Sequence, residues 1–281
     1  MFKARVVTAL LLMAGFLAAL FLLPFWGWLL LMSALAGMAA WEWGGLIRLG
    51  AAARRAYALF VAMLSVALGA LAFDMDTGAV RQADLLYAVF LLAAGFWLLV
   101  VPFWLKAKWP LSARLPGLLS GVVILIPAAL AMMLLRAFAP LFLLAVMALI
   151  WVADIGAYVC GRAFGRHKLA PFISPGKTWE GVAGAVAGVL IYATAVFLAT
   201  GRTATAAAWA WFLAALCVLT AVSILGDLFE SLAKRQAGVK DSGAVLPGHG
   251  GVLDRIDSLT STLPLVGIAV LESLAWEALP S

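Results

Sequence analysis

The chain is 281 residues long; 66% of its residues are apolar and only 11% are charged. Soluble domains carry about 25% charged residues, so this composition excludes an ordinary water-soluble globular protein. A formal net charge of +6 would suit a nucleic-acid ligand in a soluble protein. In a membrane protein, basic residues instead concentrate in the cytoplasmic loops and set the orientation, so we expect no nucleic-acid partner.

Continuous apolar runs predict membrane-spanning helices. A span needs about 20 mostly apolar residues, and within lipid only helices and closed barrels satisfy their own backbone hydrogen bonds. Barrel strands alternate apolar and polar residues, which these runs do not. We predict an all-α, polytopic helical bundle of about nine transmembrane helices in the lipid bilayer. The predicted spans lie near residues 6–23, 25–47, 56–73, 84–105, 115–135, 137–158, 179–200, 205–230 and 258–275.

The basic residues predict the orientation of these spans. If the N-terminus is cytoplasmic, all 19 Lys and Arg residues except Arg81, Arg136 and Arg202 fall on the cytoplasmic side. This bias is what the positive-inside rule predicts. We therefore expect a multi-pass protein of the cell (inner) membrane, with the N-terminus inside, the C-terminus outside and the active site on the cytoplasmic side.

Charge is distributed differently in the two halves of the chain. Up to residue 135 the charged residues sit in loops, apart from Glu42 near a helix end. A charge within a span costs at least about 2.5–3.5 kcal/mol, so acids inside spans indicate function. We interpret residues 1–135 as a transmembrane scaffold and residues 136–281 as the catalytic region with its cytoplasmic loops. The acids within its apolar segments are Asp154, Glu180, Asp227 and Glu230.

The first polar cluster lies towards the end of the eighth predicted span. Its members are spaced i, i+3, i+4 and i+7, so they share one face of a helix. They are Asp227, Glu230, Ser231 and Lys234. A purely structural pair of Glu230 and Lys234 across one turn is the alternative.

The stretch that follows interleaves basic residues, acids and glycines. Carboxylates hold Mg²⁺ together with phosphate oxygens, and Lys and Arg offset the charge of phosphoryl groups. Glycines let backbone N–H groups approach phosphates closely. The pattern predicts a metal–polyphosphate site, with a solvated basic turn as the alternative. The residues are Lys234, Arg235, Lys240, Asp241, His249, Gly250, Gly251, Asp254, Arg255 and Asp257.

An earlier stretch, residues 154–181, contains Gly176-Lys177-Thr178 and so resembles the end of a P-loop. A P-loop would require glycine at position 171, which is proline, and a preceding strand, so we reject it. Ser174, Lys177 and Thr178 still lead into a predicted helix, whose N-terminus attracts anions. We predict that they bind a substrate phosphate; a basic loop that only sets topology is the alternative.

Together these stretches resemble the phosphatidate cytidylyltransferases, also called CDP-diacylglycerol synthases. Residues 231–257, S-L-A-K-R-Q-A-G-V-K-D-S-G-A-V-L-P-G-H-G-G-V-L-D-R-I-D, resemble the family signature, except that Ala233 is small where the family has a bulky apolar residue. The D-x-G-A-Y…G-R-x-F-G-R…I-S-P-x-K-T-x-E-G pattern of residues 154–181, which includes Glu180, is also similar, as is Gly226-Asp227-Leu228-x-Glu230-Ser231. The resemblance covers residues 154–258.

The resemblance implies an integral membrane nucleotidyltransferase that makes CDP-diacylglycerol and pyrophosphate from CTP and phosphatidate for phospholipid biosynthesis. It implies a Mg²⁺ cofactor and a homodimer. Asp227 and Asp254 become the leading metal ligands, with Asp257 in support. The implied phosphate clamps are Lys234, Arg235, Lys240 and Arg255; Asp241 joins the catalytic set, and Ser231, Glu180 and His249 the substrate-binding set.

Two other functions remain open. A CTP-dependent lipid or polyprenol kinase would need similar metal and phosphate groups but would attack the γ-phosphorus. A membrane transporter would also place acids within spans. The clustering of charge on one side and the lack of an inverted repeat speak against the transporter.

Overall fold

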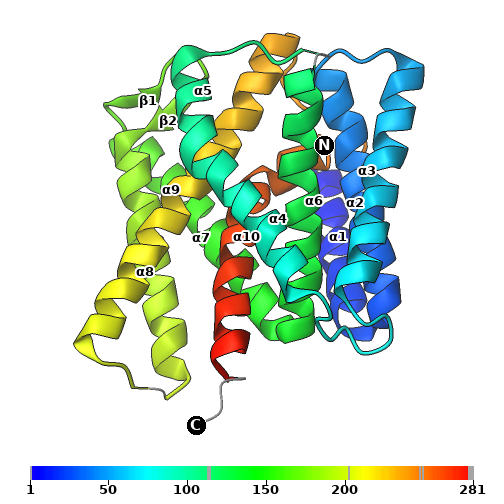
Figure 1. Cartoon of the computed structure of the whole chain (residues 1–281). Coiled ribbons are helices and arrows are strands. Elements are labelled where there is room, and N and C mark those ends of the chain that lie inside the picture. The colour runs from blue at the N-terminus through cyan, green and yellow to red at the C-terminus, as the bar shows by residue number, and fades with distance from the viewer. Residues whose placement is uncertain (1, 113–114, 202, 247, 249, 278–281) are drawn as a thin grey trace.

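The computed structural model describes residues 2–112, 115–201, 203–246, 248 and 250–277. The helices form one bundle, with a small hairpin at one end (Figure 1). The first half comprises α1 (Phe2–Leu22), α2 (Phe25–Leu46), α3 (Ala51–Ala72), α4 (Ala83–Gly95), the π-helix η1 (Phe96–Val100), α5 (Val101–Ala107) and α6 (Leu115–Phe138). The second comprises α7 (Pro140–Phe164), β1 (Lys168–Ala170), β2 (Ser174–Thr178), α8 (Trp179–Ala199), α9 (Ala206–Ala237) and α10 (Leu253–Glu277).

Eight helical stretches in the described part of the chain are long and apolar enough to cross a membrane. One of them, Ala83–Ala107, runs through α4, η1 and α5, and α1 adds a shorter apolar helix, Thr8–Leu22. Each predicted span thus corresponds to a helix. The prediction of a polytopic, all-α membrane bundle is confirmed, and the protein is a multi-pass membrane protein.

Proline explains where the helices are irregular. Pro102 has no N–H to donate, and the π-helical turn of η1 lies just before it. Pro264 lies inside α10, and on its N-terminal side the buried hydroxyls of Ser261 and Thr262 both donate to the carbonyl of Ser258. Pro264 itself cannot donate to the carbonyl of Thr260, four residues earlier, and so removes one bond of the helical ladder.

Glycines set the closest helix contacts around the site. A Cβ at Gly156 of α7 would lie 2.5 Å from the carbonyl oxygen of Gly184 in α8, and a Cβ at Gly226 of α9 would lie 2.7 Å from the carbonyl oxygen of Asp257 in α10. Small residues let membrane helices approach this closely. As a result α7, α8, α9 and α10 bring their polar residues together.

Some boundaries differ from those predicted. Residues 168–178, expected to be a loop, form an antiparallel hairpin. Helices α7 and α9 continue to Phe164 and Ala237, beyond the predicted ends of their spans, and α10 begins at Leu253 rather than near residue 258. The extra turns of α9 and α10 contain charged residues, and hydropathy therefore did not include them. They place Asp254 in the first turn of α10 and keep Lys234 on the same helix as Asp227, as the i+7 spacing predicts.

Candidate active site

A cavity of about 440 Å³ lies between α7, β2, α8, α9 and the first turns of α10. Apolar wall residues alternate with polar groups that include Asp154, Arg162, Lys177, Asp227 and Ser258. Ser174 and Thr178, predicted to bind phosphate, also line it. A cavity with a few convergent polar groups is the usual form of a small-molecule site. The 154–181 stretch and the end of α9 therefore meet at one place.

Lys177 and Asp227 join the two walls of this cavity. The Nζ atom of Lys177 lies 2.5 Å from Oδ2 of Asp227. The hydroxyl of Ser231, one turn along α9, donates to Oδ1 of Asp227 at 3.2 Å. Both side chains face the cavity, where the lysine can bind a polyanion and the carboxylate can bind its counter-cation.

Gly176, Lys177 and Thr178 lie in the strand β2 rather than in a phosphate-binding loop, and Thr178 fixes the position of Lys177. Thr178 is buried, and its side chain caps α8 by accepting from the N–H of Gly181 at 3.1 Å. This cap fixes the end of β2, so Lys177 points into the cavity. Glu180 instead accepts from the ring Nδ1 of His167 at 2.6 Å and does not line the cavity. Its predicted role at the substrate stays a prediction.

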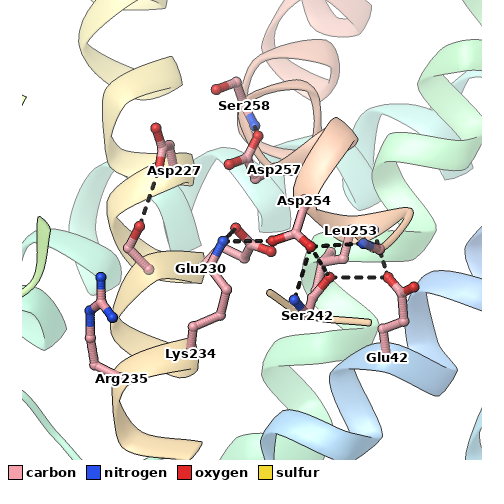
Figure 2. A network of polar contacts seen from close by, with 12 residues as sticks. Glu42, Asp227, Glu230, Lys234, Arg235, Ser242, Leu253, Asp254, Asp257 and Ser258 are labelled. Carbon is pink, nitrogen blue, oxygen red and sulfur yellow. Dashed lines mark hydrogen bonds and ion pairs between the residues drawn. The ribbon is translucent and has the colours of Figure 1, made fainter. Parts of the chain in front are cut away.

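A second polar cluster surrounds Asp254 in the first turn of α10 (Figure 2). Lys234 Nζ lies 2.7 Å from Asp254 Oδ1 and 2.6 Å from Glu230 Oε2. Asp254 Oδ2 accepts from the N–H groups of Ser242 and Gly251 and from the Ser242 hydroxyl, each at 2.9 Å. Oδ2 is thus occupied by protein donors, whereas Oδ1 has Lys234 as its one described partner.

Glu42, which sequence analysis assigned to the scaffold, reaches this same cluster. Its Oε1 accepts from the N–H of Val252 at 3.0 Å, and its Oε2 accepts from the N–H of Leu253 at 2.8 Å. Figure 2 shows it projecting from α2 towards the start of α10. The signal in the sequence was an acid beside a long apolar run; its partners lie more than 200 positions away and could not be read from local spacing.

Asp257 lies between the two clusters. It interacts electrostatically with Asp227 and Asp154 on one side and with Glu230 on the other. Four of the predicted acids lie along facing sides of α9 and α10, as Figure 2 shows: Asp227, Glu230, Asp254 and Asp257. They are not scattered. Asp154 was noted in the sequence as an acid within a span, and the structure adds it to the cavity.

The donor set fits a divalent cation that is completed by substrate oxygens. Among the described residues, no three His, Cys, Asp or Glu side chains converge closely enough to hold a metal alone. Mg²⁺ is usually bound by one or two carboxylates plus phosphates, so such a cage is not required. Glu230 Oε1 is buried without a hydrogen-bond partner beside this acidic series. An unsatisfied carboxylate oxygen there is consistent with a site for positive charge.

The remaining predicted residues surround these clusters. Arg235 is exposed and donates from Nε to the carbonyl of Ile173 in the hairpin at 3.3 Å. Lys240, Asp241 and Arg255 are exposed. Gly250 has a φ of +80°, and a Cβ there would lie 2.9 Å from Asp254 Oδ2, so glycine is required on two grounds. His249 lies outside the described residues.

The chain is similar to known proteins along most of its length. The model of the cytidylyltransferase family matches residues 3–272. A phosphatidate cytidylyltransferase of Pseudomonas aeruginosa is 44% identical, with 99% of this chain and 100% of that protein aligned. That of Haemophilus influenzae is 38% identical over 94% of this chain and 96% of its own. That of Brucella suis is 41% identical over 62% of each chain.

Proposed function

The chain belongs to the cytidylyltransferase family, and from that premise we propose that it is a phosphatidate cytidylyltransferase. It transfers the cytidylyl group of CTP to phosphatidate and yields CDP-diacylglycerol and pyrophosphate for phospholipid biosynthesis. The observation that carries this proposal is similarity along the whole chain to proteins of that name. The cavity shared by Lys177 and Asp227 is where we place the chemistry.

The reaction forms one phosphorus–oxygen bond and breaks another. A phosphate oxygen of phosphatidate attacks the α-phosphorus of CTP, and the bond from the α-phosphorus to the oxygen bridging it to the β-phosphorus breaks. The electron pair of that bond leaves with pyrophosphate. Phosphatidate is already anionic, so the site needs no strong base. The main barrier is repulsion between two anions, which positioning and fixed positive charge reduce.

The basic residues are placed to reduce that repulsion. Lys177 projects into the cavity from β2, and Lys234 lies at the acidic series on α9. Arg235, Lys240 and Arg255 are exposed around it, where incoming phosphates can reach them. We propose that Lys177 contacts the phosphates within the cavity and that the exposed group clamps the triphosphate. Asp241 stays in the proposed catalytic set.

A divalent cation, Mg²⁺ in our proposal, would supply charge neutralisation of the triphosphate when bound. Asp227 and Asp254 would hold it, with Asp257 in support. Asp227 faces the cavity directly. Asp254 does not line the cavity, and its Oδ2 is held by Ser242 and Gly251. Its Oδ1, which pairs with Lys234 at 2.7 Å, would bind the cation once Lys234 turns to a phosphate.

The surface of α7 beside the cavity supports entry of the lipid substrate from the bilayer. Ile155, Tyr158 and Val159 are 62%, 64% and 54% exposed, and Tyr158 also lines the cavity. An apolar surface at the mouth suits the acyl chains, and the Arg162 guanidinium, 2.8 Å from the Tyr158 hydroxyl, suits the headgroup phosphate. We propose that phosphatidate enters here while CTP enters from water.

Orientation and assembly form part of the same proposal. The C-terminal end of α10 lies at the opposite end of the bundle from the β1–β2 hairpin (Figure 1). Together with the bias of basic residues, this supports an inner-membrane enzyme with a cytoplasmic active site, a cytoplasmic N-terminus and an external C-terminus. A homodimer, and the division into a scaffold (1–135) and a catalytic region (136–281), stay proposals.

Purified protein with labelled CTP, phosphatidate and Mg²⁺ tests the function directly. We expect CDP-diacylglycerol and equimolar pyrophosphate. CDP as the co-product would instead identify a kinase, and substrate flux into sealed vesicles without CTP consumption would identify a transporter. Asp227→Asn should abolish turnover without changing thermal stability by more than a few degrees, whereas Asp76→Asn, in an exposed turn, should leave both unchanged.

A further inference from the structure

Glu42 is fully buried in α2, in the half of the chain that we interpreted as scaffold. Placing an ionisable side chain within an apolar segment is costly, so strong compensating contacts are required. All of its hydrogen-bond partners described above, Ser242, Val252 and Leu253, come from the polar stretch between α9 and α10 and from the first residue of α10. Glu42 therefore connects α2 to the active site.

Its first contact is with the N-terminal end of α10. The first N–H groups of a helix have no partner within it and carry partial positive charge. Glu42 accepts hydrogen bonds from Val252 and Leu253, one on each carboxylate oxygen. It therefore caps α10 from another helix and fixes the turn that carries Asp254.

Its second contact is through Ser242. The Ser242 hydroxyl lies 3.2 Å from Glu42 Oε2 and 2.9 Å from Asp254 Oδ2. A hydroxyl has a single proton to donate, so it is shared between the two carboxylates. Ser242 also donates its backbone N–H to Asp254. The position of Asp254 is therefore linked to that of Glu42 by both the start of α10 and the Ser242 side chain.

Two glycines of the same stretch leave room for Glu42. A Cβ at Gly243 would lie 2.3 Å from Glu42 Oε1, and one at Gly251 would lie 2.5 Å from Oε2. Real Cβ atoms essentially never lie this close to another heavy atom. The backbone thus wraps closely around this one carboxylate, which explains why these positions need glycine.

We propose that Glu42 is a positioning residue for the reaction: it fixes Ser242, Val252 and Leu253, so that Asp254 is held with its Oδ1 towards Lys234. Glu42 touches no reacting group, so its effect on turnover acts through Asp254. The expected effect of Glu42 on turnover rests on the proposed function, whereas its effect on the positions of Ser242, Val252 and Leu253 does not.

The test compares Glu42→Gln with the wild-type enzyme by steady-state kinetics and by hydrogen exchange of the segment 241–254. Glutamine keeps the shape but replaces one acceptor oxygen with a donor, so one of the two backbone bonds is lost. We expect kcat to fall about 10- to 100-fold, because small misplacements of a catalytic group have effects of this size. KM for phosphatidate should change less than threefold, and exchange should rise in 241–254 but not in α6.

Tyr57→Phe is the matched control. It removes a hydrogen bond to the carbonyl of Leu118, 2.8 Å long, within the same half of the chain but outside the hydrogen bonds that Glu42 makes. It should lower thermal stability without changing kcat or exchange in 241–254. Ser242→Ala is the second variant, and it should reproduce the loss of kcat and add little to it in the Glu42→Gln background.

Unchanged kcat in Glu42→Gln would overturn the proposal. A uniform rise in exchange, with activity following only the folded fraction, would do the same. If the wild-type protein makes no CDP-diacylglycerol, the proposed function fails, and exchange in 241–254 alone then decides whether Glu42 holds this stretch.

Discussion

Lys177 Nζ and Asp227 Oδ2 are 2.5 Å apart, which ties the strand before α8 to the cavity-facing side of α9. Each group is assigned to a different partner in the proposed reaction, Lys177 to phosphate and Asp227 to the cation. Paired with each other, both charges stay satisfied until substrate arrives. The exchange of partners requires only that a cation and a phosphate enter the same cavity together.

Replacing Lys177 by glutamine should weaken CTP use. The variant loses the phosphate contact and leaves Asp227 without its cation, so we expect kcat/KM for CTP to fall about 100-fold, as for other lost charge contacts to phosphates. Initial-rate measurement of pyrophosphate release checks this. Lys168→Gln, the same change of charge at an exposed position of β1, should retain nearly full activity.

Lys234 and Lys240 should differ in their effects on stability. Lys234 is 15% exposed and bridges two buried carboxylates, so Lys234→Met leaves both without their cation. Loss of one partner from a buried ion pair costs about 3–5 kcal/mol. Lys240 is exposed, and Lys240→Met should lower activity without changing stability. Thermal unfolding in detergent distinguishes them; equal melting temperatures would contradict the buried network.

The contact between α7 and α8 should tolerate no methyl group at its closest point. In Gly156→Ala the new Cβ would meet the Gly184 carbonyl oxygen at 2.5 Å, so the helices must separate and the cavity between them changes shape. We expect a loss of about 1–3 kcal/mol in stability, as for other overpacked contacts. In Gly188→Ala, where the nearest atom is 3.3 Å away, the melting temperature should stay close to that of the wild type.

Chelation should remove activity without unfolding the protein. No preformed cage of three ligands exists among the described residues, so the cation should bind tightly only together with nucleotide phosphates. We expect EDTA to abolish turnover and added Mg²⁺ to restore it. Mg²⁺ alone should leave the melting temperature unchanged, whereas Mg²⁺ with CTP should raise it with increasing CTP concentration. A large stabilisation by Mg²⁺ alone would indicate a complete protein site.

The sequence determined the fold class and the residues among which we propose the chemistry. Hydropathy is summed along a helix, so the apolar runs predicted the spans without knowledge of their packing. The i, i+3, i+4 and i+7 spacing likewise placed Asp227 and Lys234 on one face, because that relation is local to a helix. Charge within apolar segments pointed to Asp154 before any contact was known.

Only the tertiary structure decided which hydrogen-bond and ion-pair partners each of these side chains has. The sequence made Asp254 a leading candidate metal ligand but could not distinguish its two oxygens, whereas the fold occupies Oδ2 with Ser242 and Gly251 and leaves Oδ1 to Lys234. Glu42 appeared as part of a scaffold, yet it caps α10. Local patterns specify which residues share a helix face. Which faces meet depends on the packing of helices far apart in the chain, through contacts such as that of Gly226 with α10, which no periodicity encodes.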